Sequence, residues 1–93
     1  MRFVWDEDKN KRLKQQRNIS FEQIVLSIEN KQVADVIENP NKEKHREQIY
    51  IMVNYDEYIY VVPAFISASG EECRLRTIYP SRKYTKIYLR SNE

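Results

Sequence analysis

The chain has 93 residues, of which 41% are hydrophobic and 32% are charged, and its formal net charge is +2. This length predicts a single globular domain, residues 1–93, with one modest core. A single Gly and three Pro exclude extensive linker or low-complexity sequence. The small net charge does not by itself predict nucleic-acid binding, and no apolar stretch approaches the roughly 20 residues of a membrane span.

Cysteine and histidine each occur once, as Cys73 and His45. One cysteine excludes an intramolecular disulfide and a cysteine-based zinc site. One histidine excludes a histidine-rich metal site within a single chain. We expect no metal and no cofactor. Residues 1–10, "MRFVWDEDKN", lack the apolar run of a signal peptide, so we expect a cytoplasmic protein.

The first part of the chain predicts two helices. Asp6 is placed to cap the first helix, in which Leu13 is the only large apolar residue. Ser20 followed by Gln23 forms a capping box for the second helix, which has one apolar face. The expected elements are a strand at 2–5, a helix at about 7–17, a helix that begins after Ser20, and a strand at 33–38.

The second part of the chain predicts an antiparallel sheet. Residues 48–53 and 58–66 are rich in β-branched and aromatic residues and flank "NYDE", which predicts a hairpin. Residues 73–79 alternate as a further strand. Pro63 within a strand indicates an edge position or a bulge. We expect an α+β fold of about four antiparallel strands, with the N-terminal helices on one face and a short C-terminal helix.

That C-terminal helix is expected to begin after Pro80, which stops the last strand. Ser81 onward can form it, with Tyr84, Ile87 and Tyr88 as its buried side because they are spaced i, i+3, i+4.

Basic residues are concentrated in "TIYPSRKYTKIYLR", residues 77–90. On a helix, Arg82, Lys86 and Arg90 share one stripe, and Lys83 lies beside it. Such a cluster can hold a phosphate and stabilise charge that builds on it. The plainer interpretation is a solvated basic helix end that the helix macrodipole favours. Spacing alone favours the plainer interpretation.

Other candidate groups also have an ordinary structural interpretation. His45 can act as a general acid or base near neutral pH, but a lone His in a charged loop is usually a surface residue. The tyrosines could stack on bases, although their strand and helix spacing favours core positions. Cys73 within a strand is expected to be a small apolar packing residue rather than a nucleophile.

Three stretches, in this order, resemble the BrnT family of bacterial toxins. They are "FVWDEDKNKRLKQQRNISFEQI" near the start, "HREQIYIMV" in the middle and "RLRTIYPSRKYTKIY" near the end. The matching residues are Phe3, Trp5, Asp6, Lys9, Asn10, Ser20, Phe21 and Glu22 in the first stretch, and Arg76, Ile78, Arg82, Lys83, Thr85, Lys86 and Tyr88 in the last.

The resemblance implies a RelE-like fold and a toxin of a type II toxin–antitoxin system. Such a toxin is a metal-independent endoribonuclease that a cognate antitoxin protein holds inactive. Promoter DNA is then bound only through the antitoxin, and no membrane is involved. The alternative is a non-catalytic module on the same fold that binds RNA or a partner protein without cutting RNA.

The resemblance also implies roles for individual residues. Arg82 would bind the phosphate and stabilise transition-state charge, with Lys83 and Lys86 gripping the RNA backbone. Arg46 would make a second phosphate contact. His45 is the best candidate acid or base, with Lys86 or Tyr88 as alternatives. The further RNA-binding candidates are Arg76, Tyr88 and Arg90.

Overall fold

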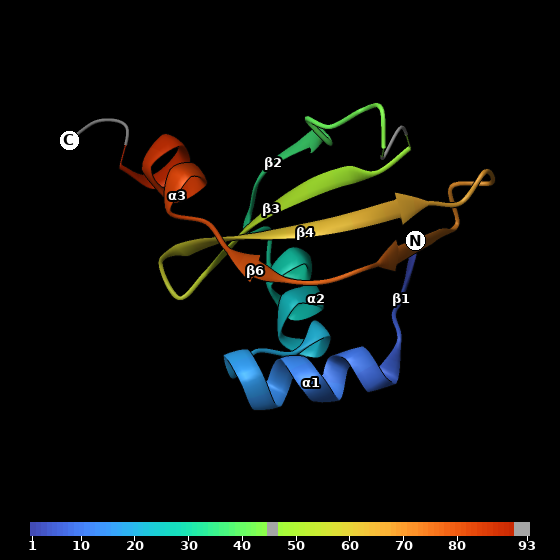
Figure 1. Cartoon of the computed structure of the whole chain (residues 1–93), viewed down its shortest axis with the longest axis horizontal. Coiled ribbons are helices and arrows are strands. Elements are labelled where there is room, and N and C mark those ends of the chain that lie inside the picture. Colours follow the sequence, from blue (N-terminus) through green and yellow to red (C-terminus); the bar gives the residue numbers. More distant parts are fainter. Residues whose placement is uncertain (45–46, 91–93) are drawn as a thin grey trace.

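The computed structural model describes residues 1–44 and 47–90, which form three helices and one sheet (Figure 1). The elements in chain order are β1 (Arg2–Val4), α1 (Glu7–Arg17), α2 (Phe21–Glu29), β2 (Val33–Glu38), β3 (Ile49–Tyr55), β4 (Tyr58–Ile66), β5 (Glu72–Leu75), β6 (Tyr79–Pro80) and α3 (Arg82–Leu89). The α+β class, both N-terminal helices, the β3–β4 hairpin and the short C-terminal helix are confirmed.

The sheet differs from the expected antiparallel sheet of about four strands. It is a mixed sheet of six strands in the order β1-β5-β4-β3-β2, with β6 pairing beside β4. The short β1 runs parallel to β5, whereas the other pairs are antiparallel. Parallel neighbours need a long crossover, and the whole stretch from α1 to β4 supplies it. This non-local pairing could not be inferred from local alternation.

The strands separate two apolar cores because their side chains alternate between the two faces of the sheet. On β4, Val62 and Ala64 pack in the core beneath α1 and α2, together with Phe21. Ile59 and Val61 point to the opposite face, where α3 packs. The two N-terminal helices share one face of the sheet, as expected, and α3 covers the opposite face, as Figure 1 shows. The apolar side chains on this second face must be shielded from water, and α3 shields part of them.

The last predicted strand is interrupted, and Pro63 explains why. Pro63 lies in the central strand β4, so it is not an edge residue. Its carbonyl accepts a hydrogen bond from the Arg76 N–H at 2.8 Å, but proline has no N–H to return. β5 ends at Leu75, and pairing resumes one residue out of step, with Tyr79 opposite Val61. The chain therefore leaves the sheet over residues 76–78.

Asn10 joins the two N-terminal helices although it is a fully buried polar residue. Its Oδ1 accepts a hydrogen bond from the Phe21 N–H at 2.9 Å. Its Nδ2 donates to Glu7 at 3.0 Å and to Glu22 at 2.7 Å. The hydrogen bond from Asn10 is the largest cause that holds the pKa of Glu22 below its ordinary value. Asn10 thus fixes the start of α2 against α1.

We predict that Asn10→Leu lowers the free energy of unfolding by about 1–3 kcal/mol, because it leaves the buried Phe21 N–H without an acceptor. Urea denaturation measures the change. The matched control is Gln15→Leu on the exposed side of α1, which should change stability by no more than about 0.5 kcal/mol. Equal effects of the two substitutions would contradict the assigned role of Asn10.

Candidate functional site

The C-terminal helix is held in one orientation by Thr85, which is buried. The Thr85 hydroxyl accepts a hydrogen bond from the Ile59 N–H at 2.9 Å and donates to the Ser81 carbonyl at 2.7 Å. Ser81 caps the helix by accepting from the Tyr84 N–H at 3.1 Å. The expected buried side is corrected at Ile87, which is 46% exposed. Thr85 and Leu89 face the sheet with the two tyrosines instead.

This orientation leaves the predicted basic stripe accessible. Arg82, Lys83, Lys86 and Arg90 are all exposed, and we call these four residues the α3 cations. The Lys83 ammonium nitrogen lies 5.3 Å from the centre of the Tyr84 ring. Within residues 1–44 and 47–90, no ion pair links any α3 cation to an acid. The α3 cations can therefore meet an anion without first breaking an ion pair to a described acid.

Tyr88 braces the helix against the sheet. Its hydroxyl donates a hydrogen bond to Asp35 of β2 at 2.8 Å. Burial and that hydrogen bond raise the pKa of Tyr88 to about 12. A phenol that already donates to a carboxylate and keeps its proton at neutral pH is a poor general base. We therefore assign Tyr88 a positioning role rather than proton transfer.

Arg76 lies in the segment between β5 and β6, where the chain has left the sheet. Its guanidinium carbon is 5.8 Å from the centre of the Phe65 ring, and its side chain is exposed. Phe65 also pairs across the strands with Arg74. His45 and Arg46, the other predicted site residues, lie outside the described residues.

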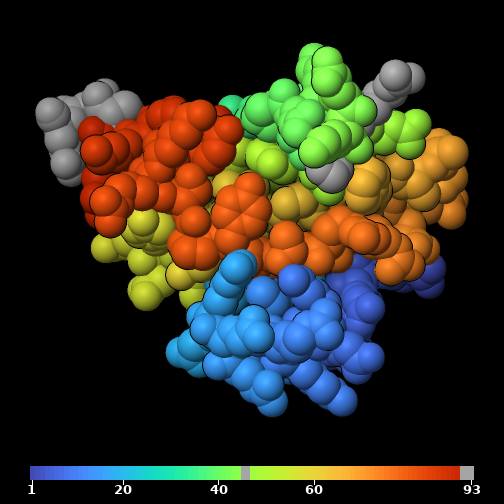
Figure 2. Space-filling view, viewed as in Figure 1, coloured from blue at the N-terminus to red at the C-terminus, as the bar shows by residue number. Residues whose placement is uncertain are grey.

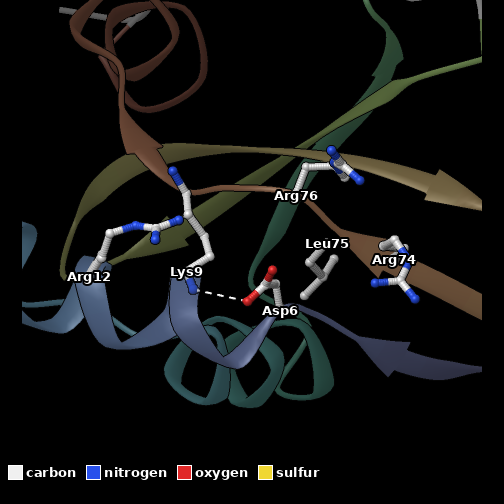
Figure 3. A pocket seen from close by; sticks show the side chains of 6 residues that line it. All are labelled: Asp6, Lys9, Arg12, Arg74, Leu75 and Arg76. Atoms are coloured by element: carbon white, nitrogen blue, oxygen red, sulfur yellow. Dashed lines mark hydrogen bonds between the residues drawn. The ribbon is translucent and has the colours of Figure 1, made fainter.

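A hollow of about 290 Å³ opens at the sheet edge between α1 and β5. We call it the edge hollow. Figure 3 shows Lys9 and Arg12 reaching from α1 toward the segment that carries Arg76. Its lining residues are Asp6, Lys9, Arg12, Arg74, Leu75 and Arg76.

The edge hollow is strongly basic. Four of its lining residues are cationic and one, Asp6, is acidic. One carboxylate oxygen of Asp6 is already occupied, because it caps α1 by accepting from the N–H groups of Asp8 and Lys9. None of the ion pairs among the described residues involves a lining cation. The arrangement favours an anion with several oxygen atoms, such as a phosphate.

Sequence reasoning identified only Arg76 of these four cations as a site residue. Basic residues near the end of a helix are favoured by the helix macrodipole. That explanation fits Lys14 and Arg17 in the last turn of the helix, but Lys9 and Arg12 lie before that turn. The available signal was their i, i+3 spacing, together with the alternating Arg74 and Arg76.

The edge hollow and the α3 cations share one side of the molecule. Figure 2 shows α1, the segment from β5 to β6 and α3 side by side on the same face. On β4, Phe65 has the same parity as Ile59 and Val61, so it points to the sheet face on which α3 packs. Its cross-strand partner Arg74 projects from that face as well. The edge hollow and α3 therefore lie on the same face of the molecule, with the segment from β5 to β6 between them.

Comparison of the sequence and structure with protein-family models, curated proteins and solved structures gives no match. None of the described helices combines the length and the apolar character that crossing a membrane requires. Within residues 1–44 and 47–90, no group of three or more His, Cys, Asp or Glu side chains is arranged to hold a metal ion. Cys73 is buried, and that burial raises the pKa of its thiol.

We predict that Thr85→Val lowers the free energy of unfolding by about 1–3 kcal/mol, because the Ile59 N–H loses its acceptor while side-chain shape is kept. Thermal or urea unfolding measures the change. Thr85→Ser retains the hydroxyl and should be clearly more stable than Thr85→Val. The reverse order would show that the hydroxyl does not hold α3.

For Tyr88, we predict that the folded protein keeps the phenol protonated at pH 10, the ordinary tyrosine pKa. The folded pKa of about 12 lies above the unfolded value, so this stabilisation is complete below pH 10 and is lost as the pH rises toward 12. A ¹³C NMR titration of labelled tyrosine, with Tyr88→Phe to assign the signal, measures it. A midpoint near 10 for that signal would contradict the Asp35 contact.

Proposed function

We propose that this protein is a metal-independent endoribonuclease and the toxin of a type II toxin–antitoxin system, with a RelE-like fold and a cytoplasmic location. The observation that supports the proposal best is the group of exposed α3 cations that no described acid pairs, on a helix that shares one face of the molecule with the edge hollow. The BrnT-like order of the sequence motifs, which includes Lys9, Arg76, Arg82 and Lys86, adds the reaction class.

The proposed reaction uses no cofactor, and its main requirement is to stabilise the negative charge that builds on the phosphate. The ribose 2′-oxygen attacks the adjacent phosphorus and the bond from phosphorus to the 5′-oxygen breaks. The proton lost by the 2′-hydroxyl is balanced by one gained at the leaving 5′-oxygen. The products are a 2′,3′-cyclic phosphate and a 5′-hydroxyl. Negative charge builds on the phosphate oxygens in between, where a guanidinium fork stabilises it.

The α3 cations are the part of the surface proposed to serve this step. Arg82 is assigned to the phosphate, with Lys83 and Lys86 on the neighbouring backbone. Thr85 and Tyr88 act as positioning residues, since they hold the helix that carries these cations. A cognate antitoxin that covers this surface would block RNA, and promoter DNA would be bound through the antitoxin.

We predict that the purified protein, free of partner, cuts end-labelled RNA in EDTA into fragments that end in 2′,3′-cyclic phosphate. The variant Arg82→Ala/Lys83→Ala/Lys86→Ala should cut at least about 100-fold more slowly, because it lacks the groups that stabilise the transition state. Gel electrophoresis of the fragments gives the rates, and circular dichroism confirms that each protein is folded.

The matched control is Lys11→Ala/Lys14→Ala/Lys44→Ala, which removes the same charge from exposed positions outside α3. It should cut at nearly the parental rate. A folded α3 variant that cuts like the parent would overturn the assigned site. A folded parent that binds RNA but releases no fragments would favour the non-catalytic module.

A further inference from the structure

A second recess adjoins the edge hollow. It measures about 230 Å³ and is lined by Phe65, Ile66, Ser67, Glu72 and Arg74. Arg74 lines both hollows, so they meet at this side chain. The two differ in character, because the edge hollow gathers cations whereas this recess contains an aromatic ring. We call it the Phe65 recess.

The only acid in the Phe65 recess is already paired. Glu72 forms an ion pair with Arg2 of β1 at 2.6 Å. Glu72 therefore does not pair with Arg74, although both residues line the recess. The recess thus offers an apolar ring and, at its junction with the edge hollow, a guanidinium that no described acid pairs. The Ser67 hydroxyl already accepts a hydrogen bond from the Glu72 N–H at 3.1 Å.

The Phe65 ring is half-buried and flanked by two arginines. Arg74 is its direct cross-strand partner, and the Arg76 guanidinium carbon lies 5.8 Å from the ring centre. Guanidinium planes and aromatic rings are the two kinds of side chain on which unstacked nucleobases stack. Arg76 also lines the edge hollow. One residue therefore lies beside both the cations that suit a phosphate and the aromatic ring that suits a nucleobase.

We propose that the edge hollow and the Phe65 recess together form a nucleotide subsite for single-stranded RNA. The phosphate lies among Lys9, Arg12 and Arg74, and the base lies against Phe65 and Arg76. This inference rests on the proposed function, because it assigns a second contact on the same substrate away from the α3 cations. A base inside a duplex is stacked on both faces, so the subsite selects an unpaired nucleotide.

The test measures binding without cleavage. The probe is a fluorescent single-stranded RNA in which every ribose is 2′-O-methylated, which removes the nucleophile of the proposed reaction. Fluorescence anisotropy gives its Kd for the full chain. A second probe has the same backbone but lacks bases. A duplex of the same length is the third probe.

We expect Phe65→Leu, which keeps an apolar side chain on β4, to weaken binding of the single strand by about fivefold or more, in line with the loss of one stacked base. Binding of the abasic probe should not change, and the duplex should bind more weakly than the single strand. The control is Leu26→Ala, an exposed apolar truncation on α2, beneath the other face of the sheet. It should leave every Kd unchanged.

The phosphate half is tested through salt dependence. Arg12→Gln should lower the slope of log Kd against log salt concentration by about 0.7, the value for one phosphate contact on a single strand. Lys11→Gln, the neighbouring charge that does not line the hollow, is the control and should leave the slope unchanged.

The two proposals can fail separately. A folded parent that cuts no RNA yet shows these binding effects retains the subsite and loses the endoribonuclease assignment. A parent that cuts RNA while Phe65→Leu and Arg12→Gln bind as the parent does retains the activity and overturns the subsite. Equal binding of single strand and duplex also overturns it, as does a parent that binds none of the probes.

Discussion

Pro63 lies in the central strand of the sheet without an N–H to donate, and the course of the chain after β5 follows from that gap. The carbonyl of Pro63 still accepts from Arg76, so β5 is held to that point, but the ladder cannot continue in register. The chain leaves the sheet and returns one residue out of step at Tyr79. Ile78 inserts into the core beneath α1 and α2, while Tyr79 faces the other core. The interruption therefore directs the chain to the second face and exposes Arg76 beside α1.

α3 has only eight residues, too few to be stable as an isolated helix in water. Its orientation depends on contacts with the sheet, of which the hydrogen bond from Ile59 to Thr85 is the most specific. A buried N–H in the strand needs an acceptor, and only one rotation of the helix brings the threonine hydroxyl to it. The same rotation turns the α3 cations outward. A requirement of the backbone thus determines which α3 side chains face outward.

Local chemistry accounts for what could be predicted from the sequence. Asp6 and the Ser20–Gln23 pair satisfy helix ends through neighbouring residues, and both helix starts were predicted at these caps. The misses depend on residues far apart in the chain. The early end of β5 depends on Pro63, and the parallel β1–β5 pair has no local pattern. On α3 the helical spacing allows either Ile87 or Thr85 to be buried beside Tyr84 and Tyr88. The hydrogen bond from the Ile59 N–H buries Thr85 and leaves Ile87 exposed. The edge hollow was missed because α1 was considered alone, without the strand that faces it.

The net charge of +2 conceals the basic surface, because several of the described acids are occupied by contacts within the fold. Asp6 caps α1, Glu22 accepts from Asn10, Asp35 accepts from Tyr88, Glu38 pairs with Lys42, and Glu72 pairs with Arg2. The cations of the edge hollow and of α3 have no such acid among the described residues. Electrostatic attraction at contact distance depends on these local pairings rather than on the sum of charges. A nearly neutral chain can therefore present a surface suited to a polyanion, provided that its acids are occupied within the fold.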